Sequence, residues 1–157
     1  MITRERDIQR QWEDSKLGNA KYNRRYKDIG TRYDLPSYLR RESLIDTRRG
    51  EEVRALIKLR CGNLEKANKY WLEEQEWKCV FCDGGMDCME HYVKECGITK
   101  EWFSIIGEED TRVIDILFKG DRHRIRDRVV LKLWKEREKE LEKRRALREW
   151  ENAGMVC

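Results

Sequence analysis

The fold of this chain depends on residues 79–96, CVFCDGGMDCMEHYVKEC, which contain the spacing C-x2-C-x8-H-x4-C. Two cysteines three positions apart across a tight turn can point at one metal ion while turn amides donate to their sulfurs. We expect Gly84 to give this turn its conformational freedom. A short helix that starts near Met89 and loosens at its end brings His91 and Cys96 to the same side.

Three thiolate sulfurs and one imidazole nitrogen suit Zn²⁺ and close its tetrahedron. We therefore predict that Cys79, Cys82, His91 and Cys96 bind a structural zinc ion, with no position left for a catalytic water. Disulfide pairing is the alternative, but it needs an oxidising compartment, and the charged N-terminus is not typical of a secretory signal. A redox CxxC needs a βαβ context, which helical flanks do not offer.

Cys88 is a fifth candidate ligand. It could substitute for one of the four, but it directly precedes the helix expected from Met89, where a capping residue belongs. We interpret Cys61 as a buried small apolar side chain and Cys157 as a terminal thiol.

The flanks of the cysteine segment carry helical patterns. Residues 51–60 combine acidic residues in the first turn, basic residues in the last turn and Gly62 just beyond, which matches the helix dipole and a C-terminal cap. Further helices are expected over 3–16 and 20–29, with a turn at 36–41, and after the cysteines over 99–106 and 110–118. One long helix is expected over 122–150, with its apolar positions Ile125, Val129, Leu133 and Trp134 in a first half that packs and with a second half that protrudes.

The composition also predicts a mostly helical protein. The chain has 157 residues, of which 42% are charged and 39% apolar, with a single proline. We predict a mostly α fold, an irregular helical array around a small zinc knuckle with a long charged C-terminal helix and no large hydrophobic core. The expected divisions are a basic helical segment 1–62, the knuckle 63–98 and a helical tail 99–157. No apolar run is long enough for a membrane span, so we expect an intracellular protein, nuclear or cytoplasmic.

The net charge of +4 is unevenly distributed. Residues 1–60 hold 16 basic and 10 acidic groups, residues 61–120 hold 7 and 13, and residues 121–157 hold 12 and 8. Two basic flanks around an acidic centre could hold a polyanion, although helices this polar can also simply be solvated.

Three stretches together resemble a known family. They are residues 55–63 (ALIKLRCGN), residues 68–74 (NKYWLEE) and the cysteine segment ending in M-E-H-x4-C. They resemble the region after the polymerase domain in reverse transcriptases of non-LTR (LINE-type) retrotransposons, which end in a CCHC zinc knuckle preceded by an R-x-G-N helix end. The resemblance covers about residues 20–140 and implies the same four ligands, with Cys88 where relatives often have Thr or Ser.

The chain also departs from that family. It has no Asp-Asp doublet for the two metal ions of a polymerase, and no proline after Pro36 for the Pro-Asp motif of an endonuclease. We therefore expect a detached C-terminal piece, either a degenerate fragment or a host protein that kept the module. No enzymatic activity is expected, since His123 lies among arginines and no serine has a histidine or a glycine-rich turn beside it.

Two functions follow as hypotheses. The first is binding of RNA, or another single-stranded nucleic acid, through basic and aromatic side chains of the flanks. The candidates are Tyr22, Arg24, Arg25, Tyr26, Lys27, Arg122, Arg124 and Arg126, although ordinary packing of a short helix also accounts for Tyr22 and Tyr26 and is the favoured interpretation of these two. The second is a protein-interaction module that uses the zinc centre and the helix over 122–150.

Overall fold

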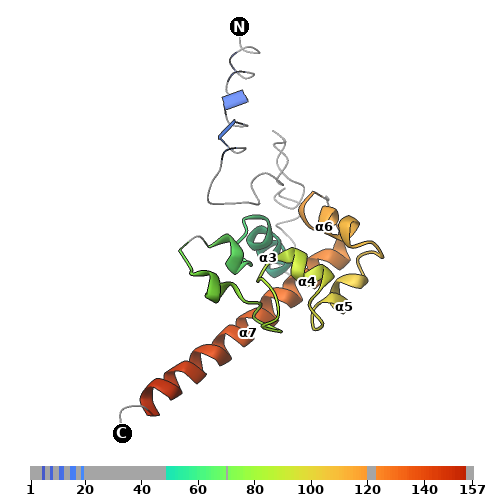
Figure 1. Cartoon of the computed structure of the whole chain (residues 1–157). Helices are drawn as coiled ribbons and strands as arrows, with labels where there is room; N and C mark the ends of the chain where they lie inside the picture. Colours follow the sequence, from blue (N-terminus) through green and yellow to red (C-terminus); the bar gives the residue numbers. More distant parts are fainter. Residues whose placement is uncertain are drawn as a thin grey trace.

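The computed structural model describes residues 49–69, 71–119 and 123–154, together with isolated positions between 5 and 19. The described chain is mostly helical, which confirms the predicted fold class (Figure 1). The isolated positions from 5 to 16 are helical, as predicted for 3–16. The helix expected over 20–29 and the turn at 36–41 lie outside the described residues.

The first continuous helix is α3 (Gly50–Arg60), and its end is fixed by Gly62. Gly62 adopts a left-handed conformation (φ 70°), and its amide donates to the carbonyl of Leu59 at 2.9 Å. The next amide, that of Asn63, donates to the carbonyl of Lys58 at 2.8 Å. This pair of hydrogen bonds is a Schellman motif, which glycine enters without steric cost. The R-x-G-N sequence is therefore a helix stop, as predicted.

Two short 3₁₀ turns and four helices follow. They are η4 (Lys66–Asn68), η5 (Glu74–Trp77), α4 (Met89–Lys94), α5 (Lys100–Ser104), α6 (Asp110–Phe118) and α7 (Arg124–Gly154). The four predicted ligands of the knuckle lie between the end of η5 and Cys96, two residues beyond α4.

Helix α7 has two different halves. Its first half packs along α3, Arg144 in its second half still reaches the turn at Val80–Asp83, and its last turns extend away from the rest of the described chain (Figure 1). The side chains near its end are open, with Leu147 56% and Trp150 75% exposed. The prediction of a packed start and a protruding end is confirmed, but the protruding part begins later than the middle of the helix, after Arg144. Ile125 is a correction, since it is exposed: the buried stripe of α7 runs through Arg126, Val130, Leu133 and Arg137.

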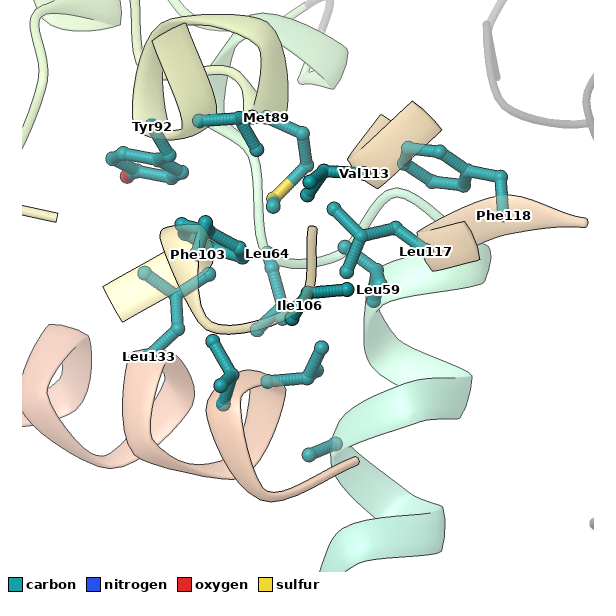
Figure 2. Close-up of a cluster of buried hydrophobic side chains, with 14 of the residues drawn as sticks. Leu59, Leu64, Met89, Tyr92, Phe103, Ile106, Val113, Leu117, Phe118 and Leu133 are labelled. Carbon is teal, nitrogen blue, oxygen red and sulfur yellow. The ribbon is translucent and has the colours of Figure 1, made fainter. Parts of the chain in front are cut away.

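One hydrophobic cluster unites α3, α4, α5, α6 and α7 (Figure 2). Leu59, Tyr92, Phe103, Leu117 and Leu133 come from these five helices in turn and converge there. Cys79 and Cys96 are members of the same cluster. The core is thus continuous through all three segments that the sequence analysis separates, and two predicted metal ligands form part of it.

Within the described ranges, no helix has the combination of length and apolar character that crossing a bilayer requires.

Candidate metal centre

The four predicted ligands lie together. Cys79 and Cys82 come from the turn after η5, His91 from α4, and Cys96 from the residues just after that helix. Their ligand atoms all lie within 4.8 Å of one another. The sulfurs of Cys79 and Cys96 are 3.9 Å apart, and the Cys82 sulfur is 3.2 Å from Nε2 of His91. The fifth candidate, Cys88, is not part of this group.

These separations fit a tetrahedral zinc site. With Zn–S near 2.3 Å and Zn–N near 2.0 Å, the edges of a tetrahedron are about 3.8 Å between sulfurs and about 3.5 Å between sulfur and nitrogen. The observed values lie close to these edges. A disulfide between Cys79 and Cys96 would instead need a sulfur separation of about 2.05 Å. The group therefore has the size of a metal site, and its Cys₃His chemistry is that of Zn²⁺.

A hairpin-like turn presents the first two cysteines. The amide of Cys79 donates to the carbonyl of Gly85 at 2.7 Å, and Lys78 and Met86 form an antiparallel bridge below it. At the tip, Asp83 has a left-handed conformation (φ 54°), and its amide donates to the carbonyl of Cys79 at 3.1 Å. The amide of Phe81 points at the Cys79 sulfur at 3.4 Å. Amide donors of this kind stabilise a thiolate.

The glycine that matters most is Gly85 rather than Gly84, which corrects the sequence prediction. A Cβ at Gly85 would overlap the imidazole of His91, far inside van der Waals contact. A Cβ at Gly84 would meet only ordinary contacts, 3.7 Å from the oxygen and the sulfur of Cys82. Gly85 thus lets the backbone of the turn pack directly against the ligand ring.

Helix α4 orients His91. Its Nδ1 lies 3.2 Å from a carboxylate oxygen of Glu95, the C-cap residue four positions later. A carboxylate that accepts from Nδ1 selects the tautomer in which Nε2 is free to bind a metal. Nε2 is the nitrogen that faces the Cys82 sulfur. The pairing of Glu95 with His91 was not found from the sequence, although their i, i+4 spacing is a usable signal.

The start of α4 is held by a residue from far back in the chain. Cys88 occupies the N-cap position, as predicted, but no hydrogen bond of its side chain caps the helix. The carboxylate of Glu65 accepts instead from the amide of Met89 at 2.7 Å. Glu65 is buried, and an acidic acceptor at a helix N-terminus also matches the helix dipole. Sequence reasoning missed this cap because the two residues are 24 positions apart.

The two buried cysteines differ in acidity. Burial raises the pKa of the Cys79 thiol to about 12. Burial acts in the same direction on Cys96, but hydrogen bonds from Thr99 and from the amide of Ile98 favour its thiolate and lower its pKa to about 7. Zn²⁺ binds thiolates and displaces their protons. Cys96 is therefore readily available as a thiolate, whereas Cys79 depends on a metal to lose its proton.

Two arginines of α7 fasten the knuckle to the body. Arg137 forms a buried ion pair with Asp87, and its Nε donates to the hydroxyl of Tyr92 at 3.3 Å. Arg144 donates to both carboxylate oxygens of Asp83 at 2.9 and 3.0 Å. It also donates to the carbonyl of Val80 at 2.7 Å. The metal-binding turn is thus part of a packed assembly that includes α7.

The structure changes the set of proposed nucleic-acid contacts. Arg126 is fully buried: its Nε donates to Asp127 at 2.9 Å, and its Nη1 donates to the carbonyl of Ile116 at 3.1 Å. It is occupied inside the protein and is removed from the set. Arg124 is exposed and stays a prediction. The remaining candidates lie outside the described residues, namely Tyr22, Arg24, Arg25, Tyr26, Lys27 and Arg122.

No protein-family model matches this chain, and neither does any curated protein or solved structure with which it was compared.

Proposed function

We propose that the chain is a zinc-stabilised module that binds nucleic acid, with RNA as its partner. The observation that carries the proposal is the Cys₃His group, whose donors lie within 4.8 Å of one another and whose two buried sulfurs belong to the hydrophobic core. Because four protein donors complete the tetrahedron, the ion has no open position and its role is structural. The module has no enzymatic activity of its own.

Zinc supplies folding free energy in this proposal. Structural zinc sites in small finger peptides are worth about 10–16 kcal/mol near neutral pH. Cys79, Cys82, His91 and Cys96 would hold the ion, while Glu95 and Gly85 fix the orientation of the imidazole. The binding surface is then built from cationic side chains around this fixed centre, because a zinc ion with three thiolates carries a net charge of about −1 and attracts no phosphate itself.

RNA is favoured as the partner by the resemblance to the region that follows the polymerase domain of LINE-type reverse transcriptases. The residues that carry that resemblance include the helix stop at Arg60–Asn63 and the knuckle itself. The chain is accordingly proposed to be a piece of such an enzyme without its polymerase domain. A polymerase reading frame directly upstream in the genome would identify it as a fragment of the element, and its absence would favour a host protein that kept the module.

The zinc part of the proposal is tested by elemental analysis of the purified chain. We expect about one zinc per chain, lost in Cys82→Ser and kept in Cys88→Ser, which is the matched control because Cys88 lies outside the ligand group. Metal-free protein that keeps its near-ultraviolet circular dichroism in chelator would reject a structural zinc.

The RNA part is tested by a gel-shift titration with single-stranded RNA at several salt concentrations. Phosphate contacts require that the affinity fall as salt rises. The absence of a complex at micromolar protein, or an affinity that does not change with salt, would reject RNA binding.

A protein-interaction module is the second candidate, and one observation favours it. Leu147 and Trp150 leave apolar side chains exposed on the protruding end of α7, where they could enter a partner's groove. Light scattering distinguishes the two functions: a concentration-dependent dimer that is lost in Leu147→Gln/Trp150→Gln would favour association through this helix.

A further inference from the structure

A cleft lies between the second half of α7 and the segment that precedes the knuckle. Figure 1 shows this segment beside the middle of α7. The cleft has a volume of about 300 Å³ and six cationic side chains in its wall, with Glu76 as its acidic one. The residues that line it are Lys66, Lys69, Leu72, Glu76, Arg137, Leu141, Arg144, Arg145 and Arg148. We call it the cationic cleft.

The positive charge of the cationic cleft is only partly neutralised. Arg137 and Arg144 are paired with the aspartates of the knuckle. The side chains of Lys66, Lys69, Arg145 and Arg148 form no ion pair with any residue that the structure describes. At Lys66 the pKa is lowered, first by burial and then by the charges of Arg137, Arg144 and Arg148, against the opposing effect of Asp87. The cleft therefore carries more positive charge than neighbouring carboxylates neutralise. Such an excess attracts anions.

The knuckle holds the two walls of the cleft in place. On one wall, the carboxylate of Asp87 accepts from the amide of Lys66 at 3.1 Å. The same carboxylate pairs with Arg137 on the opposite wall, in α7. Farther along α7, Arg144 is held by Asp83 and by the carbonyl of Val80. The cationic cleft is therefore assembled by the same turn that presents the metal ligands.

The size of the cleft limits what can enter it. A volume of about 300 Å³ lies at the lower end of the range for small-ligand pockets, which suits one unpaired nucleotide of a strand. Leu72 and Leu141 add apolar surface beside the charges. Grooves that track the backbone of single strands are likewise positively charged.

We infer that the cationic cleft binds the phosphate groups of single-stranded RNA, with Arg145, Arg148, Lys66 and Lys69 as the contacting side chains. The inference rests on the proposed RNA-binding function and gives it a place on the molecule. That place differs from the flanking residues to which the sequence points. Because the knuckle holds both walls, binding at the cleft requires an intact metal centre.

The test measures the anisotropy of a labelled single-stranded RNA with the full zinc-loaded chain, across a range of salt. Arg145→Gln/Arg148→Gln removes two exposed cations of the cleft. Arg54→Gln/Arg112→Gln is the matched control, since it removes two exposed arginines on α3 and α6 that do not line the cleft. Circular dichroism and zinc content verify that both double variants are folded.

The expected result follows from counterion release. Each phosphate contact to a single strand contributes about 0.7 to the slope of log affinity against log salt. The cleft variant should therefore lose about 1.4 in slope and roughly 20-fold in affinity near 0.1 M salt, whereas the control keeps the slope of the wild type. Duplex RNA should compete less well than the unlabelled single strand.

Other outcomes are separable. If the wild type binds RNA and the cleft variant binds with unchanged affinity and slope, the cleft assignment is wrong and the proposed function stands. If duplex RNA competes better than single strands, the assignment to a single strand is overturned. If the wild type does not bind RNA at all, the proposed function fails. Binding of polyglutamate that depends on Arg145 and Arg148 would then assign the cleft to an acidic protein segment.

Discussion

The two halves of α7 contain similar residues and do different things. Arg126 and Arg137, in the first half, are buried and paired with the aspartates Asp127 and Asp87. Arg145 and Arg148, in the second half, are exposed at the wall of the cationic cleft. Arginine thus has a structural role in the first half of the helix and is a candidate ligand contact in the second half.

The difference lies in what other segments bring to the helix. A buried arginine is tolerated only where acceptors meet its guanidinium, and the chain supplies them to the first half: Asp127 is adjacent, and the knuckle brings Asp87. Among the described residues, the ion pair that another segment forms with the second half is that of Asp83 with Arg144. Beyond that point the arginines keep their charge available. The number of arginines in a helix therefore does not indicate its role; the position of the acids does.

Loss of the metal should have the largest effect, because the first half of α7 then loses the core on which it packs. The first half of α7 packs on a core that contains Cys79 and Cys96, so we expect Cys96→Ser, or chelation of the wild type, to abolish cooperative thermal unfolding. The expected loss approaches the whole stability of the domain, since structural zinc contributes about 10 kcal/mol or more in small folds. Differential scanning calorimetry with and without zinc measures it. A chelated chain with an unchanged melting transition would contradict the prediction.

The second largest difference is expected when one arginine in each half is replaced by methionine and the unfolding free energies are compared. Arg137→Met leaves Asp87 buried and unpaired, and should cost about 3–5 kcal/mol of unfolding free energy. Arg148→Met, on the exposed half, should change it by less than about 0.5 kcal/mol. Urea unfolding followed by circular dichroism measures both.

A double variant tests the reason for that cost. Asp87→Leu with Arg137→Met removes both charges, and should be more stable than Arg137→Met alone because no uncompensated charge is left inside. Equal stability of the single and double variants would show that removal of the unpaired carboxylate gains nothing over the hydrogen bond that it accepts from the amide of Lys66.

A substitution at Gly85, which packs against His91, should destabilise the protein less than loss of Arg137 does. Gly85→Ala pushes the turn away from the imidazole, and overpacking of this kind costs about 1–3 kcal/mol. Gly84→Ala is the matched control, because the new methyl group there makes ordinary contacts. Competition with a zinc chelator should show weaker metal binding in Gly85→Ala than in Gly84→Ala. A reversed order would contradict the packing described for the turn.

The smallest expected effect concerns the cap of α4. Glu65→Ala removes the acceptor for the amide of Met89 and should cost about 1 kcal/mol, as losses of N-caps do. Glu65→Gln keeps an acceptor oxygen without the charge and should cost less. Thermal melts of the two variants make the comparison, and an equally large loss in Glu65→Gln would assign the effect to charge rather than to capping.

What the sequence could predict was local. The four ligands lie within residues 79–96, the acids, bases and glycine of α3 are adjacent to its ends, and the decline of apolar residues along α7 predicts its protruding end. Each of these signals needs only the spacing along one segment. The fold class and the grouping of the ligand residues followed from them.

What it could not predict was long-range pairing. Nothing in the sequence connects Glu65 with Met89 or Asp87 with Arg137, because their hydrogen bonds exist only after the helices have packed. The burial of Arg126 is of the same kind. Its alternation with Arg124 and Arg128 is typical of a basic surface, but Arg126 is buried and its guanidinium donates to the carbonyl of Ile116 on α6. The choice between Gly84 and Gly85 likewise depends on where the ring of His91 comes to lie.

The distances along the chain also set an order of assembly. The ligand group closes a loop of fewer than 20 residues, whereas Arg137 and Arg144 reach back 50 and 61 positions to their aspartates. Closing short loops costs less entropy and is faster, and a chain made from its N-terminus exposes Cys96 well before α7 exists. The knuckle can thus capture its ion on the nascent chain, and α7 then docks on a finished surface. In refolding, zinc uptake should precede the change in the fluorescence of Trp134 that reports the docking of α7.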